Sequence, residues 1–338
     1  MRITSVTTMK DEAPFILEWV AYHRLIGLND ILVFSNDCSD GTDDMLDRLD
    51  DLGLIRHYPN PSMFTGNPKH HLQVVRYINT FSRLRRSDWV TSFDADEFIC
   101  INTGAGKVED LFNDMPDTDV WSMSQLNFGH GGVSEYTDAL MGEQFHYCWD
   151  YHSNFFTRQN KRGTKSMTRM AAKPVEIRNH SCVFDPAAQN NLIMRNGSGA
   201  HIKDVDLSRD VKSLLHPDYG FDLVQLNHYP LRSIDSFLLK RMRGNANHDN
   251  ADYGIKYWRK YDFNVVRNDS IARWIPDVRA MRDDLLKDPV LGPLHRSAVE
   301  NAQNRIAGLK QNEHVQGLMA AINRYVRRNP GILAQAAG

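Results

Sequence analysis

The sequence predicts an α/β fold in which a doubly wound, Rossmann-like half is followed by a less regular half and by helices at the end of the chain. In the first hundred residues, short apolar segments alternate with amphipathic segments of helical periodicity, the order typical of a parallel sheet covered by helices. After about residue 268 the pattern becomes mainly helical. With 338 residues, 41% of them hydrophobic, the chain can bury a substantial core.

Four apolar segments of the first half predict strands. We expect these strands at 3–7, 31–34, 54–58 and 89–93, with helices between them at about 11–23, 42–52 and 69–85. Asp11 can cap the first helix, which has Pro14 in its first turn. Parallel strands joined by helices place their carboxyl ends at one edge of the sheet, where open α/β sheets bind ligands.

The second half is predicted in less detail. We expect strands at 120–126 and 224–229, strands and turns over 165–184, a helix at 233–242 capped by Ser233, and a last helix at 306–326. The glycine-rich segment 127–132 could approach a bound substrate closely.

The amino-acid composition limits the kinds of molecule that the chain is expected to bind. Lys and Arg number 40 against 42 Asp and Glu, a net charge of -2, so nothing in the overall charge attracts nucleic acid or an anionic membrane. Four widely spaced cysteines form no Cys-x-x-Cys pair, which argues against a zinc or redox motif. Without a signal-peptide-like start or an apolar run of about 20 residues, the expected location is cytoplasmic.

The segment Phe93-Asp94-Ala95-Asp96-Glu97-Phe98 follows the fourth predicted strand directly. In an extended segment Asp94 and Asp96 point the same way, and paired carboxylates suit Mg²⁺ or Mn²⁺ bound to phosphate oxygens. The alternative is an ordinary turn at the end of a strand. Glu97 either orients the pair through hydrogen bonds or carries a surface charge.

A polar loop at 36–42 follows the second predicted strand and faces the same edge. Asp37 and Asp40 could accept hydrogen bonds from a base or a ribose. The competing interpretation is a capping turn with Asp40 or Thr42 as the N-cap residue.

Several ordered motifs resemble glycosyltransferase family 2, in particular its bacterial branch. They are the segments 7–12, 18–23 (Glu-Trp-Val-Ala-Tyr-His), 36–42 and 93–98, with a weaker match over 227–244. The resemblance implies a GT-A fold with a mixed central sheet, a nucleotide-sugar donor and inversion at the anomeric carbon. It divides the chain into a catalytic domain, 1–265, and a C-terminal helical extension, 266–338. Within the domain, 1–100 would bind the nucleotide-sugar and 101–265 the acceptor.

The resemblance also implies roles for single residues. Thr7, Glu12 and Asp37 would line the nucleoside pocket, with Asp40 beside them. Asp94 and Asp96 would hold the metal and the diphosphate, and His228 would be a third metal ligand or a diphosphate contact, with His180 and His201 as competitors. Lys240 and Arg243, three residues apart on one helix, could neutralise the departing diphosphate.

An inverting transfer also needs a group that takes the proton of the acceptor hydroxyl. The predicted catalytic residues are Asp96, Glu135 and Asp249; the sequence offers further candidates in Asp138, Glu143, Asp252 and His130.

The chain has Ser270 where the Gln-x-x-Arg-Trp motif of processive synthases has glutamine, which favours addition of a single sugar. We therefore expect a metal-dependent transferase that uses a UDP-sugar and a glycan or lipid-linked acceptor, with possible membrane contact through the basic end of the last helix. The alternatives are a non-catalytic nucleotide-sugar-binding module and a nucleotidyltransferase.

Overall fold

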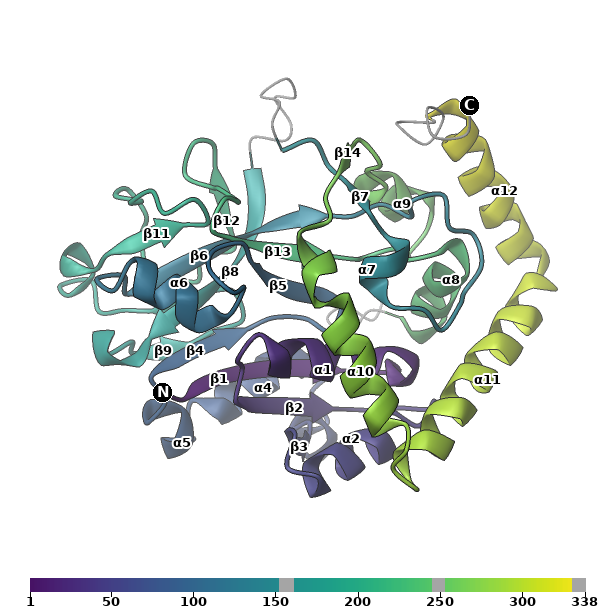
Figure 1. Cartoon of the computed structure of the whole chain (residues 1–338), viewed down its shortest axis with the longest axis horizontal. Coiled ribbons are helices and arrows are strands. Elements are labelled where there is room, and N and C mark those ends of the chain that lie inside the picture. Colours follow the sequence, from purple (N-terminus) through teal and green to yellow (C-terminus); the bar gives the residue numbers. More distant parts are fainter. Residues whose placement is uncertain (152–160, 245–252, 330–338) are drawn as a thin grey trace.

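The computed structural model describes residues 1–151, 161–244 and 253–329. Through them runs a ten-stranded mixed sheet, with the order β3-β2-β1-β4-β8-β6-β13-β5 along its main path. Figure 1 shows this sheet crossing the molecule, with helices α10, α11 and α12 running along its outside.

The first half of the sheet is parallel, as predicted. Strands β1 (Ile3–Met9), β2 (Asp30–Ser35), β3 (Arg56–Pro59) and β4 (Trp89–Ser92) pair in parallel around β1. They are connected by η1 (Ala13–Phe15), α1 (Ile16–Leu25), α2 (Thr42–Asp51), α3 (Ser62–Thr65), α4 (His70–Ile78) and α5 (Ser82–Arg85). All four predicted strands and the first two predicted helices are therefore confirmed, with small shifts at their ends. The predicted cap of the first helix by Asp11 is wrong, because the Asp11 carboxylate accepts from the Ser39 amide instead.

The single helix predicted over 69–85 is wrong in one respect, because α4 and α5 are separate. Asn79, which ends α4, donates from its amide to the carbonyls of Val75 and Ile177, and its side-chain oxygen accepts from the Ile177 amide. Such side-chain bonds offer the backbone an alternative to helical hydrogen bonding.

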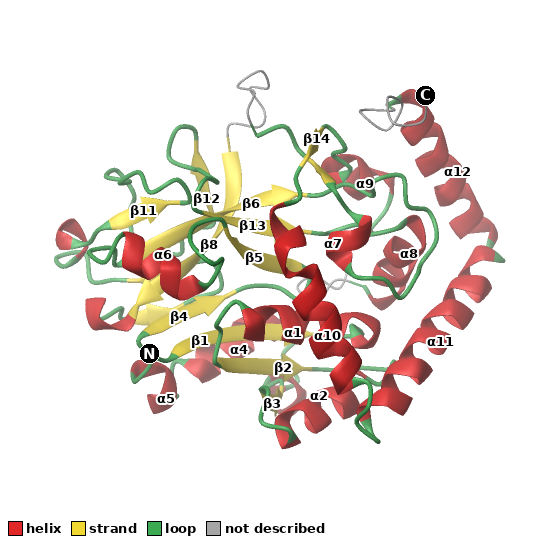
Figure 2. Cartoon of the chain, viewed as in Figure 1, coloured by secondary structure: helices red, strands yellow, loops and turns green. Residues whose placement is uncertain are grey.

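The second half makes the sheet mixed. Strand β8 (Lys161–Arg169) lies antiparallel between β4 and β6 (Val120–Asn127), β13 (Val224–His228) runs parallel to β6, and β5 (Glu97–Ile101) is antiparallel to β13. The shorter elements are α6 (Val108–Asp114), α7 (Met141–Gln144), β7 (Tyr147–Cys148), β9 (Glu176–Ile177), β10 (Cys182–Val183), β11 (Met194–Asn196), β12 (Ser213–Leu215) and β14 (Val266–Arg267). Strands β9 and β10 form a separate two-stranded sheet, as do β7 and β14; Figure 2 shows the strands of the main sheet crossing the molecule.

The C-terminal half of the chain supplies the outer helices α8 (Ile234–Arg243), α9 (Ile255–Tyr261), α10 (Ile275–Leu285), α11 (Leu291–Lys310) and α12 (Glu313–Arg328). The Ser233 hydroxyl caps α8 by accepting from the Ser236 amide, as predicted. The last predicted helix, 306–326, is instead two helices. The Asn312 side chain accepts from the amides of His314 and Val315 and begins α12 anew.

Helix α12 turns its apolar face toward the rest of the molecule. Its Val315, Leu318 and Ile322 are buried in a cluster with Leu231, Ile234, Phe237, Leu238 and Trp258, most of them from α8 and α9. Among the described residues no helix is both long and apolar enough to cross a bilayer.

Candidate active site

A cavity of about 350 Å³ lies where β1, β2 and β4 end, between the two halves of the sheet. One wall comes from the first half and the other from the second, with the acidic segment after β4 between them. The lining residues used below are Thr8, Lys10, Glu12, Asn36, His70, His71, Asp94, Asp96, His180, His228, Lys240, Arg243, Tyr253, Tyr257 and Tyr261.

The acidic segment is a tight turn, so the extended geometry expected for it is wrong. The Glu97 amide donates to the Asp94 carbonyl (3.0 Å), and the Asp94 amide donates to the Glu97 carboxylate (2.8 Å). Glu97 is fully buried and accepts a second hydrogen bond from the Gln125 amide (2.5 Å). Glu97 therefore orients the turn through hydrogen bonds, as one of the two predicted alternatives had it, and is not a surface charge. Asp94 and Asp96 both line the cavity.

The Glu-Trp-x-x-Tyr-His segment fixes this turn from behind. On α1, the Trp19 indole donates to the carbonyl of Glu97 (3.2 Å) and the Tyr22 hydroxyl donates to the carbonyl of Ile99 (2.9 Å). The His23 ring bonds the Trp19 carbonyl (2.8 Å). All three side chains are essentially inaccessible to solvent. The motif thus acts by tying α1 to the start of β5, directly after the two aspartates.

Each aspartate of the turn faces cationic side chains. Asp96 lies 2.8 Å from Lys240 Nζ and 3.7 Å from His228 Nε2. Burial opposes ionisation of Asp96, but the charges of Lys240 and His228 outweigh it and hold its pKa well below the usual range. Asp96 therefore carries a negative charge at neutral pH.

Asp94 lies 3.4 Å from Lys165 Nζ and 3.3 Å from His71 Nε2. Its pKa is also below the usual range, because Lys165 and His71 outweigh burial. Lys165, on β8, is completely buried, and its ammonium group also bonds the carbonyl (3.3 Å) and side-chain oxygen (3.2 Å) of Asn179. Burial alone would lower the pKa of Lys165, but Asp94 and Glu97 raise it, so a buried ammonium ion underlies the acidic turn.

Glu12 is a third carboxylate of the cavity wall and is bound by two arginines. Arg232 donates to it at 3.0 Å and Arg243 donates to its other oxygen. These charges outweigh burial and lower the pKa of Glu12. Both Asp11 (φ 49°) and Arg232 (φ 56°) adopt the left-handed backbone conformation, which is costly for residues other than glycine.

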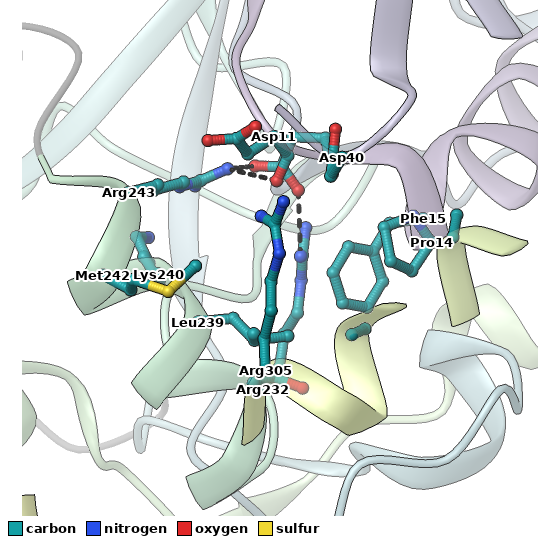
Figure 3. A pocket seen from close by; sticks show the side chains of 14 residues that line it. Asp11, Pro14, Phe15, Asp40, Arg232, Leu239, Lys240, Met242, Arg243 and Arg305 are labelled. Carbon is teal, nitrogen blue, oxygen red and sulfur yellow. Dashed lines mark hydrogen bonds and ion pairs between the residues drawn. The ribbon is translucent and has the colours of Figure 1, made fainter. Parts of the chain in front are cut away.

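Behind Glu12 lies a separate, much smaller cavity of about 30 Å³, drawn in Figure 3. The dashed lines in Figure 3 join Arg232 and Arg243 to the Glu12 carboxylate. Arg305 of α11 also lines it and donates to the Ser39 carbonyl, which connects α11 to the loop after β2. This volume is too small to hold a sugar ring.

Two histidines of the cavity are held by their Nδ1 atoms. His228 Nδ1 lies 2.7 Å from the Asn127 side-chain oxygen, and His180 Nδ1 lies 3.0 Å from the Thr164 carbonyl. An oxygen acceptor requires a proton on Nδ1, so in the neutral form of either ring the lone pair is on Nε2. Burial and the charge of Lys165 lower the pKa of His180, which keeps this ring neutral. His201 lines a different hollow, beside Lys203 and Gln189.

The predicted nucleoside contacts are placed as follows. The Thr7 hydroxyl is buried and donates to the Phe93 carbonyl (3.0 Å), whereas its neighbour Thr8 lines the cavity. In the loop after β2, Asn36 lines the cavity and Asp37 is exposed. Asp40 accepts from the amides of Thr42 and Ala13 (both 3.0 Å). The predicted N-cap role of Asp40 or Thr42 is wrong, because Gly41 is the N-cap residue of α2 and no side chain of the described residues caps this helix. The side chains of Thr7 and Asp40 thus make hydrogen bonds within the protein.

The candidates for the catalytic base lie mostly elsewhere. Glu135 is exposed and does not line the cavity, and Asp249 and Asp252 lie outside the described residues. Asp138 pairs with Arg282 and His295, and Glu143 pairs with Arg279. His130 is buried against Asp262 (2.7 Å). Asp96 is the predicted catalytic residue that the structure places in the cavity.

In 1–151, 161–244 and 253–329, no cluster of three or more His, Cys, Asp or Glu side chains is arranged to hold a metal ion. Donor atoms are nevertheless present in the cavity. Oδ1 of Asp94 is buried without a hydrogen bond, and the 3.7 Å between Asp96 and His228 Nε2 is too long for one.

Sequence reasoning missed Lys165, His71 and the three tyrosines of the cavity wall. Lys165 stands in a polar stretch of β8 and becomes a partner of Asp94 only through strand pairing between distant segments. A signal for the tyrosines did exist, since they recur at every fourth position from 253 to 261.

Comparison with known proteins gives one family. The model of glycosyltransferase family 92 matches residues 3–233. A glycosyltransferase family 92 protein of rice, Oryza sativa subsp. japonica, is 28% identical over 95 residues, which are 28% of this chain and 15% of that protein. The resemblance to family 2 is therefore confirmed at the level of a glycosyltransferase, while the family that matches is 92.

Solved structures show a distant likeness. S. aureus TarS 1–349 in complex with UDP is 13% identical, with a TM-score of 0.31 over 92% of each chain. Mannosyl-3-phosphoglycerate synthase from Rubrobacter xylanophilus is 14% identical, with a TM-score of 0.27 over 37% of this chain and 40% of that one. Nothing about the substrate follows from TM-scores this low.

Proposed function

Because the chain belongs to glycosyltransferase family 92 and has an α/β fold of the GT-A type, we propose that it moves one sugar from a UDP-sugar to a hydroxyl group of a glycan. The observation that carries the proposal is the Asp94 to Glu97 turn in the floor of the cavity, with its aspartates in contact with Lys165, Lys240 and two histidines.

The donor would lie across this floor. Thr8, Asn36 and His70 come from the strand ends and helix of the first half, where a doubly wound sheet binds a nucleoside. Lys240 and Arg243 stand on the opposite wall and would neutralise the diphosphate as it gains charge on leaving. Lys240 would then exchange Asp96 for a phosphate oxygen.

We further propose that a divalent cation, Mn²⁺ or Mg²⁺, accompanies the donor. Asp94 and Asp96 bring carboxylate oxygens, the ligands that such a cation prefers, to the part of the cavity where the diphosphate would lie. Asp94, Asp96 and His228 Nε2 would hold the cation, and Asn127 would orient His228. A bound cation would supply charge neutralisation of the diphosphate.

For the acceptor we propose inversion, with His180 taking the proton. His180 is neutral, its Nδ1–H is held by the Thr164 carbonyl, and its Nε2 carries a lone pair in the cavity. Asp96, the carboxylate predicted for catalysis, would serve the donor instead. A lipid-linked acceptor and membrane contact through α12 stay predictions.

The test is hydrolysis and transfer with UDP-sugars by the full chain and by Asp96→Asn. We expect the variant to lose at least about a hundredfold in turnover, since an anionic contact to the donor is removed, while it remains folded by circular dichroism. Asp206→Asn, an exposed aspartate on a distant loop, is the matched control. Full activity of Asp96→Asn would reject the assignment of the site.

A further inference from the structure

Three tyrosines form a ladder along one wall of the cavity. Tyr257 and Tyr261 lie on α9, four residues apart and therefore on one face of the helix, and Tyr253 lies just before α9 begins. The ring centroids of Tyr253 and Tyr257 are 4.6 Å apart, and those of Tyr257 and Tyr261 are 4.7 Å apart. All three line the cavity and are only partly buried.

The ladder lies beside the proposed reaction centre. Lys240 Nζ is 5.8 Å from the ring of Tyr253 and 5.5 Å from that of Tyr257. The ring of Tyr261 stands edge-on to that of His228 at 5.6 Å. Through Lys240 and His228 the ladder borders Asp96, on the wall opposite Thr8 and Asn36.

A buried network of hydrogen bonds fixes α9, the helix that carries Tyr257 and Tyr261. Trp258 points away from the tyrosines into the core, and its indole donates to Asp262 (3.0 Å). Asp262 in turn accepts from the amide (3.1 Å) and ring (2.7 Å) of His130. The glycine-rich segment at 127–132, expected to meet the substrate, therefore anchors α9 instead, and the aromatic wall is preorganised.

The chemistry of this wall distinguishes among ligands. One face of a pyranose ring presents several C–H groups, which pack against the electron-rich face of an aromatic ring, while its hydroxyls need polar partners at the rim. Partly exposed tyrosines next to Lys240 and His228 offer both. An alkyl chain offers no hydrogen-bonding groups to this polar rim. The nucleoside is already assigned to the strand ends of the first half.

We propose that the Tyr253, Tyr257 and Tyr261 ladder is the acceptor subsite and that it binds a saccharide whose pyranose ring stacks on Tyr257. This inference rests on the proposed function. It makes the acceptor group a sugar unit, so the subsite recognises the saccharide itself and needs no contact with a lipid.

The experiment probes a glycan array with the full chain in the presence of UDP and Mn²⁺, using wild type, Tyr257→Ala and Tyr257→Phe. We expect wild type to retain at least one class of glycan, Tyr257→Ala to bind it about tenfold more weakly, and Tyr257→Phe to bind within about threefold of wild type. Tyr325→Ala, a partly buried tyrosine on α12 that stacks with Arg259, is the control. The thermal shift caused by UDP should be the same in all four proteins.

The outcomes separate the two proposals. A normal UDP shift with no glycan retained by wild type, with retention only of vesicles that carry polyprenyl phosphate, or with full binding by Tyr257→Ala, overturns the acceptor subsite alone. Loss of the UDP shift in Tyr257→Ala places the tyrosine on the donor and also overturns it. Absence of both UDP binding and UDP-sugar hydrolysis in wild type overturns the proposed function, and the subsite with it.

Discussion

Glu18 allows a quantitative test of how the buried face of α1 is packed, through the dependence of stability on pH. Glu18 is 8% exposed and accepts from the Met141 amide (2.7 Å). Burial raises its pKa from 4.5 to about 7, against the smaller opposing effects of the Met141 hydrogen bond and of Arg282. Below pH 4.5 Glu18 is protonated in both states. Between there and pH 7 only the unfolded state ionises, which favours unfolding.

The folded state therefore loses stability as pH rises through this window, by about 1.4 kcal/mol for each pKa unit and about 3 kcal/mol in all. Glu18→Gln removes this loss. We expect its free energy of unfolding, relative to wild type, to rise by about 3 kcal/mol between about pH 4.5 and pH 8. Urea unfolding followed by tryptophan fluorescence measures it, with the exposed Glu300→Gln as control. A difference that does not change with pH would refute the reasoning.

Three further predictions concern the floor of the cavity. Lys165→Met should lower the free energy of unfolding by about 3–5 kcal/mol, because Asp94 and Glu97 lose a buried cation; an effect below about 1 kcal/mol in urea unfolding would contradict this. Tyr22→Phe should cost about 1–3 kcal/mol by leaving the buried Ile99 carbonyl without its donor, whereas a neutral result in the same assay would mean that the carbonyl finds another partner. Treatment with EDTA should abolish UDP-sugar turnover and added Mn²⁺ should restore it; turnover that persists at full rate after chelation would exclude a required cation.

Much of the fold follows from local pattern. The strands of the first half are continuous apolar runs between turn-forming residues, so they were predicted to within a few residues. The errors come from interactions that no local pattern contains. Asn79 and Asn312 interrupt predicted helices through side-chain hydrogen bonds, and β5 pairs with β13, more than a hundred residues later.

The site was predicted in outline for the same reason. Asp94 and Asp96 were placed at a ligand edge by their position after a predicted strand, whereas His228, Lys240 and Arg243 were joined to them through the family resemblance and helix spacing; all five line one cavity. Thr7 shows that the prediction was wrong by a single residue. Because successive side chains along a strand face opposite sides of the sheet, the Thr7 hydroxyl is buried and the next residue, Thr8, lines the cavity.

Lys165 and the tyrosine ladder could not be placed from the sequence, because only the packing of β8 and α9 brings them to the acidic turn. The sequence shows the charge of Lys165 and the aromatic rings of the tyrosines, but it does not show which residues they contact.

The central claim is that the acidic turn binds the diphosphate of a nucleotide together with a divalent cation. The most direct measurement is the thermal shift of the full chain with UDP, with and without Mn²⁺, for wild type and Asp96→Ala. A ligand that binds the folded state raises the unfolding temperature by mass action. The account predicts a shift with UDP that depends on Mn²⁺ in wild type and is absent in Asp96→Ala. An equal shift in both proteins, or none with UDP in wild type, would contradict it.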